Sequence, residues 1–185
     1  MNVFFPVIWQ ISLLFGCFNF VFIGFITWAP TFLIQGRQVS MAHAALLMSL
    51  TSIMSMAAGP TAGWISDRIG SRKGICAIPP VLMAFLFPLS FSAGESLFFL
   101  LAVAIGFLAG FVPTGVFSAG VEVVGDEQLA GAAMAVIQIG QNSGMLLGPL
   151  ILGWVAESFG WQAVFWSLVP VSVFGGISAW TARIR

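Results

Sequence analysis

Charged residues divide this 185-residue chain into long neutral segments. Six segments contain no Asp, Glu, Lys or Arg, and each is at least 21 residues long: 1–36, 38–66, 74–94, 96–121, 128–156 and 158–182. A helix needs about 20 apolar residues to cross the hydrocarbon core of a bilayer. Each neutral segment is therefore long enough to span a membrane once.

The backbone of a spanning segment must satisfy its own hydrogen bonds, which favours helices or closed barrels. Barrel strands alternate polar and apolar residues, and these segments do not. Only 6% of the residues are charged, compared with about 25% in a soluble domain. The sequence predicts an all-α integral membrane protein with one domain over residues 1–185. The six predicted transmembrane helices cover about 5–33, 43–65, 75–92, 96–123, 128–156 and 161–182.

The basic residues predict the orientation of this six-helix bundle. An even number of spans places both termini on one side of the membrane. Five basic residues fall on that side: Arg68, Arg72, Lys73, Arg183 and Arg185. Only Arg37 falls on the other side. Because cytoplasmic loops carry an excess of Lys and Arg, we expect both termini to be cytoplasmic, in a plasma or bacterial inner membrane. The first span lacks the basic segment and cleavage site of a secretory signal.

Several classes of function are disfavoured. The chain has no basic stripe for nucleic acid. Cys17 and Cys76 lie in predicted spans without metal-ligand spacing, so we interpret them as packing residues and expect no metal or cofactor. An intramembrane serine protease needs a nucleophile and a base at mid-depth. The only histidine, His43, is predicted near an interface, as is Glu122, so neither is expected to relay protons and an enzyme is disfavoured.

The turn between the second and third predicted spans has the sequence GWISDRIGSRK, residues 63–73. Gly63 is expected to let the second span approach another helix closely. Asp67 can face the positive N-terminal end of a neighbouring helix, and Gly70 supplies the backbone freedom of a tight turn. Arg72 and Lys73 can contact anionic headgroups. The alternative interpretation is a charged cytoplasmic loop with no further role.

This turn resembles a known family signature. The pattern G-x-x-x-D-R-x-G-x-R-K, formed by Gly63, Asp67, Arg68, Gly70, Arg72 and Lys73, resembles the loop motif of the Major Facilitator Superfamily. Ser71 departs from it, because a basic residue is common there. Residues 140–165 are similar to the family's fifth or eleventh span and the turn that follows. The resemblance covers essentially the whole chain and implies one half of a twelve-helix transporter.

Three shorter segments, residues 8–10, 28–33 and 112–114, look more similar to the C-terminal half of these transporters. They resemble the branch of cyanate-permease-like carriers of anions or organic acids. The family's cavity is lined by the first and fourth helices of each half, flanked by the second and fifth. Carried onto this chain, the resemblance implies these cavity candidates: Asn19, Pro113, Thr114, Phe117, Gln138, Gln141 and Asn142.

Amide side chains inside a membrane need partners, so these candidates should face protein or water. The alternative for each is a hydrogen bond between helices, worth about 0.6–2 kcal/mol. The fifth span also carries Gly140, Gly144 and Gly148, one helical turn apart. This row is either a helix-packing face or a face that slides during transport. Pro149 removes a backbone donor and favours a bend.

The leading hypothesis is transport of a small solute through the lipid bilayer by alternating access. One six-helix unit would need a second six-helix half, or would pair with itself as a parallel homodimer. The alternative is a truncated remnant or an assembly module that does not transport.

Overall fold

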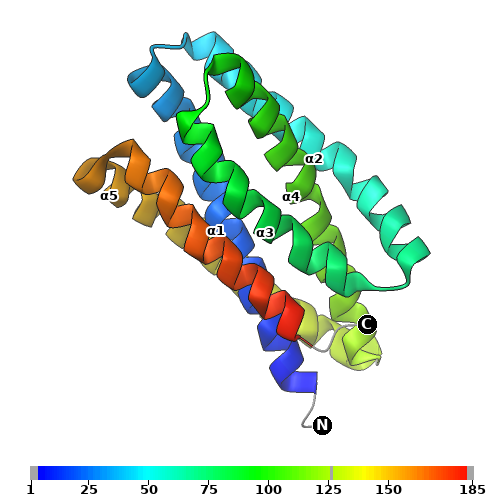
Figure 1. The fold of residues 1–185 in the computed structure, drawn as a ribbon. Coiled ribbons are helices and arrows are strands. Elements are labelled where there is room, and N and C mark those ends of the chain that lie inside the picture. Colours follow the sequence, from blue (N-terminus) through cyan, green and yellow to red (C-terminus); the bar gives the residue numbers. More distant parts are fainter. Residues whose placement is uncertain (1–3, 126, 183–185) are drawn as a thin grey trace.

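A computed structural model describes residues 4–125 and 127–182 of the chain. These residues form five assigned helices, joined by short turns (Figure 1): α1 Phe4–Arg37, α2 Met41–Ile69, α3 Arg72–Ser92, α4 Glu95–Val124 and α5 Glu127–Thr181. Helices α1, α2 and α4 run one to four residues beyond the predicted apolar spans at each end, and α3 begins three residues before its predicted span.

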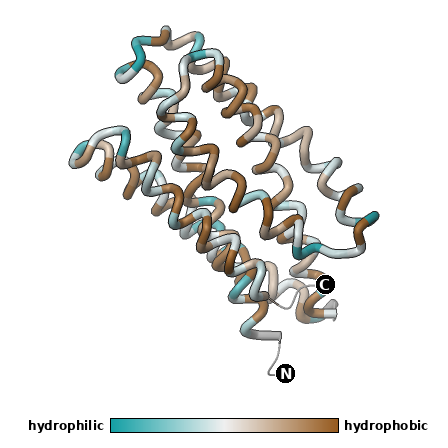
Figure 2. Tube along the Cα trace, in the orientation of Figure 1, coloured by the Kyte–Doolittle hydropathy of each residue, from teal (hydrophilic) through white to brown (hydrophobic). Residues whose placement is uncertain are grey.

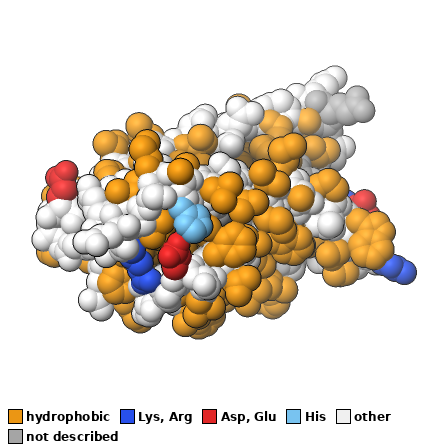
Figure 3. Space-filling model, turned by 90° about the horizontal axis from the view of Figure 1, so that it is seen from above, with side chains coloured by type: hydrophobic (Ala, Val, Ile, Leu, Met, Phe, Trp, Pro, Cys, Tyr) orange, Lys and Arg blue, Asp and Glu red, His pale blue; other side chains and the backbone are white. Residues whose placement is uncertain are grey.

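The outer surface of the bundle is apolar. All five described helices are long and apolar enough to cross a membrane. Figure 2 shows hydrophobic residues along the helices and hydrophilic residues concentrated near their ends. Hydrophobic side chains also cover most of the face seen in Figure 3, and Met56 and Phe85 are 83% and 66% exposed. Soluble monomers rarely expose so much contiguous apolar surface, so the chain is an integral membrane protein.

Helix α5 folds back on itself at Gly160. This residue has φ 80° and ψ 174°, a conformation outside the helical region that glycine adopts without a steric penalty. The two helical stretches on either side, residues 127–159 and 161–181, are called here the first and second arms of α5. The two arms run back along each other in Figure 1. The predicted boundary between the fifth and sixth spans, at 156–161, falls on this bend.

Aromatic rings fill the space around α1, which lies inside the bundle. Phe25 lies 5.4 Å from Phe87 of α3, measured between ring centroids, and 6.2 Å from Phe165 of α5. Phe32 meets Phe165 edge-on at 4.9 Å. Such aromatic pairs add about 0.5–1.5 kcal/mol each beyond the area they bury. They join α1 to helices that are distant in the sequence.

Two helix pairs run parallel in close contact, α1 with the first arm of α5 and α2 with α4. In the second pair, a β-carbon on Gly106 or Gly110 of α4 would overlap the carbonyl oxygen of Thr51 or Ser55 of α2. Glycine therefore sets the distance between these helices, as small residues do in other membrane bundles.

Candidate functional site

The glycine row of α5 lies against the backbone of α1. The contacts are Gly140 on Ser12, Gly144 on Gly16, and Gly148 on Phe20. A β-carbon on any of the three glycines would overlap α1, so the two backbones approach as closely as glycine allows. The structure thus gives these residues a packing role, and sliding along this face stays a prediction.

Two hydrogen bonds fix the register of the same helix pair. The Ser12 hydroxyl donates to the Val136 carbonyl oxygen at 2.6 Å. Near the other end of the contact, the Trp28 indole N–H donates to the carbonyl oxygen of Pro149 at 2.8 Å. The α5 helix continues through Pro149. Interhelical hydrogen bonds of this kind contribute about 0.6–2 kcal/mol in a membrane.

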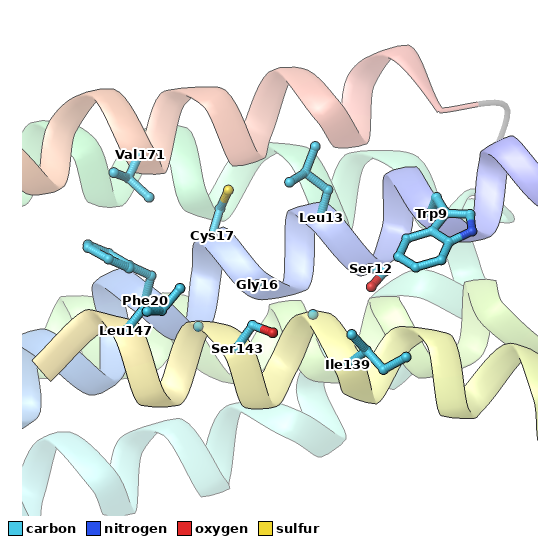
Figure 4. Close-up of a pocket in the computed structure, with 12 residues that line it drawn as sticks. Trp9, Ser12, Leu13, Gly16, Cys17, Phe20, Ile139, Ser143, Leu147 and Val171 are labelled. Carbon is cyan, nitrogen blue, oxygen red and sulfur yellow. The ribbon is translucent and has the colours of Figure 1, made fainter. Parts of the chain in front are cut away.

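A pocket of about 330 Å³ opens beside this contact, between α1 and the two arms of α5 (Figure 4). Its lining is mainly apolar and includes Trp9, Leu13, Cys17, Phe20, Ile139 and Leu147. Ser12 and Ser143 add hydroxyl groups. None of the seven predicted cavity residues lines this pocket. It is therefore separate from the polar cavity that the sequence predicts.

Asn19 and Phe117 share a neighbour inside the bundle. Asn19 is only 5% exposed, and its side-chain amide donates to the Phe15 carbonyl oxygen of its own helix at 2.8 Å. The Phe117 ring of α4 meets the Phe15 ring edge-on at 5.4 Å and is 37% exposed. Phe15 thus links the α1 and α4 candidates. The hydrogen bond of Asn19 stays within α1 and does not join two helices.

Thr114 and Pro113 lie where α4 passes α2. The Thr114 hydroxyl donates to the Gly110 carbonyl oxygen of its own helix at 3.2 Å. A β-carbon placed on Gly59 of α2 would lie 3.6 Å from that hydroxyl. Pro113 is half-buried, and α4 continues through it. Thr114 therefore lies against α2.

The three amides of α5 lie away from the glycine row. Gln138 and Asn142 are exposed, Gln141 is half-buried, and positions 138 and 142 are one helical turn apart. The structure gives none of these three side chains a hydrogen-bond partner among the described residues. Hydroxyls such as Thr27 and Ser49 instead bond to carbonyl oxygens of their own helices. Among the described residues, these amides therefore form a polar face whose side-chain hydrogen bonds remain available.

The turn signature forms an ion-pair network around Arg72. Its guanidinium donates to Asp67 Oδ1 at 2.8 Å and to Glu122 Oε1 at 3.0 Å, and it also contacts the Ser66 hydroxyl. These bonds connect α2, α3 and the end of α4. Two carboxylates thus engage the Arg72 guanidinium, and the contact of Arg72 with lipid headgroups stays a prediction. The sequence predicts Glu122 only near a membrane interface. Because Arg72 and Glu122 are predicted at the same, cytoplasmic end of the bundle, that shared position is the sequence signal for their contact.

Other residues of the signature behave differently. Gly70 ends α2 with φ 67° and donates its N–H to the Ser66 carbonyl oxygen at 3.0 Å. The expected close approach at Gly63 is wrong, because a β-carbon there would have Thr114 as its neighbour at 3.9 Å, an ordinary contact. The tight contact between α2 and α4 lies deeper, at Gly106 and Gly110. The four-residue spacing of Gly106 and Gly110 is the sequence signal for this contact.

The opposite end of the bundle holds a second set of polar contacts. The Arg37 guanidinium, at the end of α1, donates to the carbonyl oxygens of Phe91 and Ala93. His43 Nδ1 lies 3.0 Å from Glu95 Oε1, and both side chains are about half exposed. Figure 3 shows the histidine beside an acidic side chain on this surface. Within the described residues, no group of three or more His, Cys, Asp or Glu side chains is placed to hold a metal.

Comparison with known sequences identifies relatives of the chain. It matches the Major Facilitator Superfamily over residues 2–130 and, in an overlapping alignment, over residues 38–185. It is 31% identical to the multidrug resistance protein MdtG of Dickeya zeae over 134 residues, which are 71% of this chain and 32% of MdtG. It is 29% identical to the uncharacterized MFS-type transporter YuxJ of Bacillus subtilis over 119 residues, 64% of this chain and 30% of YuxJ. The chain thus spans about a third of these curated relatives.

Solved structures share its fold. A peptide transporter POT in complex with alafosfalin superposes with a TM-score of 0.82 and 17% identity, over 93% of this chain and 37% of the transporter. A structure of a proton dependent oligopeptide transporter gives a TM-score of 0.78 and 17% identity, over 98% of this chain and 42% of that protein. The family and these neighbours are transporters and not enzymes. The chain belongs to the Major Facilitator Superfamily.

Proposed function

We propose that the chain is one half of a secondary transporter, which moves a small organic solute by alternating access between two six-helix bundles. This proposal is supported by how little of each related transporter's length the chain covers. Nearly all of the chain superposes on 37% of the POT transporter. In transporters of this kind the solute site lies at the interface of two repeats near mid-membrane. The second bundle would be another part of the same polypeptide, a separate chain or a parallel second copy.

The observation that carries the proposal is the amide face of α5. Gln138 and Asn142 are exposed, Gln141 is half-buried, and all three lie near the middle of the first arm. An amide left without a partner in an apolar medium costs about 2–7 kcal/mol, depending on the reference state. Direct exposure of these three amides to lipid acyl chains would therefore be unfavourable. A second bundle enclosing a water-filled cavity supplies the missing hydrogen bonds.

We also propose six crossings, with the two arms of α5 as the fifth and sixth. The bend at Gly160 then lies at the same membrane side as Arg37 and Glu95, and both termini lie at the other side. The excess of basic residues places the termini in the cytoplasm. The likeness of residues 8–10, 28–33 and 112–114 to the C-terminal half of these transporters supports the proposal that the chain is that half. The anion-carrier branch is proposed only as one substrate class, alongside the drug-like solutes that the name of MdtG suggests.

The experiment measures transport in cells that lack endogenous efflux and uptake systems. The chain is expressed alone and with a candidate N-terminal six-helix half, and accumulation of lipophilic dyes and of labelled organic acids is followed. We expect transport to require the assembled pair of bundles. Replacing Gln141 and Asn142 by Leu should abolish transport while membrane insertion persists. Gln162→Leu is the matched control, because this exposed amide lies just beyond the bend.

Two outcomes would contradict the proposal. Unchanged transport in the Gln141→Leu, Asn142→Leu double variant would remove the amide face from the solute path. Absence of transport with every partner bundle and both solute classes would favour a remnant or assembly module. Transport by the chain alone, together with cross-linking between copies at Asn142→Cys, would identify the second bundle as a homodimer partner.

A further inference from the structure

A second groove, of about 320 Å³, lies between α3 and the second arm of α5. Apolar side chains line it: Ile78, Val81 and Leu82 from α3, and Ile177 and Trp180 from α5. Ile78, Ile177 and Trp180 are more than half exposed. The groove is therefore open along its length to whatever surrounds the bundle, which for a membrane protein is lipid.

The floor of this groove is fixed by close helix packing. A β-carbon on Gly176 would lie 3.1 Å from the Ala77 carbonyl oxygen, tighter than an ordinary contact. One helical turn before Gly176 in α5, the Ser172 hydroxyl donates to the Pro80 carbonyl oxygen at 2.6 Å. These contacts hold α3 and the second arm of α5 together beneath the exposed rim. The groove is thus already formed before any ligand binds.

A cation lies at one end of the groove. Lys73 Nζ lies 5.5 Å from the centroid of the Trp180 ring, which is part of the lining. A lysine over a tryptophan face is held there by a cation–π interaction. Among the described residues Lys73 has no carboxylate partner, whereas the adjacent Arg72 has two. Within the part of the chain that the structure describes, no carboxylate therefore neutralises the positive charge at this end of the groove.

The first turn of α3 adds to this positive end. Ser71, the residue before the helix, makes no side-chain capping bond. The first N–H groups of a helix have no partner within it, and they favour phosphate and other anions. Ala77 and Leu82 lie four and nine residues beyond Lys73, which is about 6–14 Å deeper along the helix axis. If the apolar lining lies at the depth of the acyl chains, the Lys73 ammonium therefore lies at the depth of the lipid headgroups.

We propose that this groove binds an anionic phospholipid from the leaflet at the Lys73 end of the bundle. One acyl chain lies between α3 and the second arm of α5, and the phosphate contacts Lys73 and the start of α3. Charge complementarity favours this occupant, because an anionic headgroup brings the net negative charge that balances the Lys73 ammonium, whereas a zwitterionic lipid or an apolar helix brings none. The proposal does not depend on transport, since it concerns the face made by α3 and α5.

The test uses the full chain in nanodiscs made of phosphatidylcholine alone or mixed with phosphatidylglycerol. Thermal unfolding gives the stabilisation by the anionic lipid, and native mass spectrometry counts lipids that stay bound. We expect saturable stabilisation by phosphatidylglycerol and one retained anionic lipid. Lys73→Gln should weaken this binding about fivefold, the effect of one basic residue near an anionic membrane surface. Inorganic phosphate added to phosphatidylcholine discs should give no stabilisation.

The matched control is Arg68→Gln. Arg68 also lies over a tryptophan ring, 4.9 Å from the centroid of Trp64, but α2 does not line the groove. Binding should be unchanged in this variant. Equal loss in both variants would mean general attraction to a charged surface and would overturn the proposal. Equal stabilisation by phosphatidylcholine alone would overturn it as well.

A second variant tests the groove without touching the charge. Ile78→Trp adds bulk at an exposed rim position, so it should block the acyl chain while the chain still folds. Loss of the retained lipid supports the site. Full retention in Ile78→Trp would show that the acyl chain lies elsewhere. Cross-linking between copies at Leu82→Cys in lipid would assign the groove to a second copy of the chain and would also overturn the proposal.

Discussion

Gly144 of α5 lies so close to Gly16 of α1 that a β-carbon on Gly144 would overlap the Gly16 carbonyl oxygen. The two glycines are on parallel helices separated by more than one hundred residues of sequence. In a membrane, where apolar side chains gain little by leaving lipid, such close backbone packing is a main source of helix association. The row that includes Gly144 is therefore a main packing contact between α1 and the first arm of α5.

Replacing Gly144 by Ala should destabilise the bundle by about 1–3 kcal/mol, the usual range for overpacking a tight contact. The new methyl group would force α1 and α5 apart. The matched variant is Gly131→Ala, because nothing lies within 4 Å of a β-carbon at that position. It should leave stability unchanged or raise it by up to about 1 kcal/mol. Unfolding by a denaturing detergent measures both, and equal stability of the two variants would contradict the packing role.

The Trp28 indole should contribute to the same interface through its N–H group. Trp28→Phe removes the donor to the Pro149 carbonyl oxygen and should lower the free energy of unfolding by about 1 kcal/mol. Trp154→Phe serves as control, since Trp154 is 60% exposed and its ring meets the Phe159 ring edge-on. The same unfolding assay applies. A loss in Trp154→Phe as large as in Trp28→Phe would argue against the hydrogen bond.

Arg72 and Glu122 should be energetically coupled although fifty residues separate them. A double-mutant cycle with Arg72→Gln and Glu122→Gln should give a coupling free energy of about 0.5–1 kcal/mol, because both groups are near the surface. Arg68→Gln combined with Glu122→Gln should be additive, since Arg68 lies over Trp64 instead. Additivity in the Arg72 cycle would mean that the ion pair does not form in the membrane.

The proposed six crossings predict which residues an impermeant maleimide reaches. Single cysteines are placed in a Cys17→Ala, Cys76→Ala background at Ser92, Ser158 and Ile69, all of which are exposed. Positions 92 and 158 should react in intact cells, and position 69 only after the membrane is permeabilised. Reaction of position 158 from the cytoplasmic side would contradict the fold-back of α5 across the membrane.

Asn19→Leu should change stability by less than about 1 kcal/mol, because the amide bonds only to its own helix. The two side chains are similar in size, so the buried site stays filled. Unfolding of the purified chain provides the stability measurement. A larger loss would mean that Asn19 holds two helices together. Unchanged stability with impaired transport in the assembled protein would instead assign Asn19 to the solute path.

The sequence alone determined which segments are long and apolar enough to enter a membrane, and it predicted where the helices end. Long segments without charge cannot remain in water, and residues such as Arg37, Arg72 and Glu95 cannot easily lie in lipid. This is a property of each segment by itself. The same local logic identified the bend near Gly160 and the turn at Gly70. The spacing of Gly140, Gly144 and Gly148 likewise indicated one packing face within a single helix.

Only the tertiary structure decided which residues meet. The partner of the glycine row is α1, Gly106 rather than Gly63 brings α4 and α2 together, and Arg72 bonds to the carboxylates of Asp67 and Glu122. The predicted cavity residues fall into three places: Asn19 and Phe117 around Phe15, Thr114 facing α2, and the α5 amides on an open face. Helical periodicity shows which residues share a face, but neighbouring helices and tilts determine what covers that face. These depend on contacts between segments far apart in the chain.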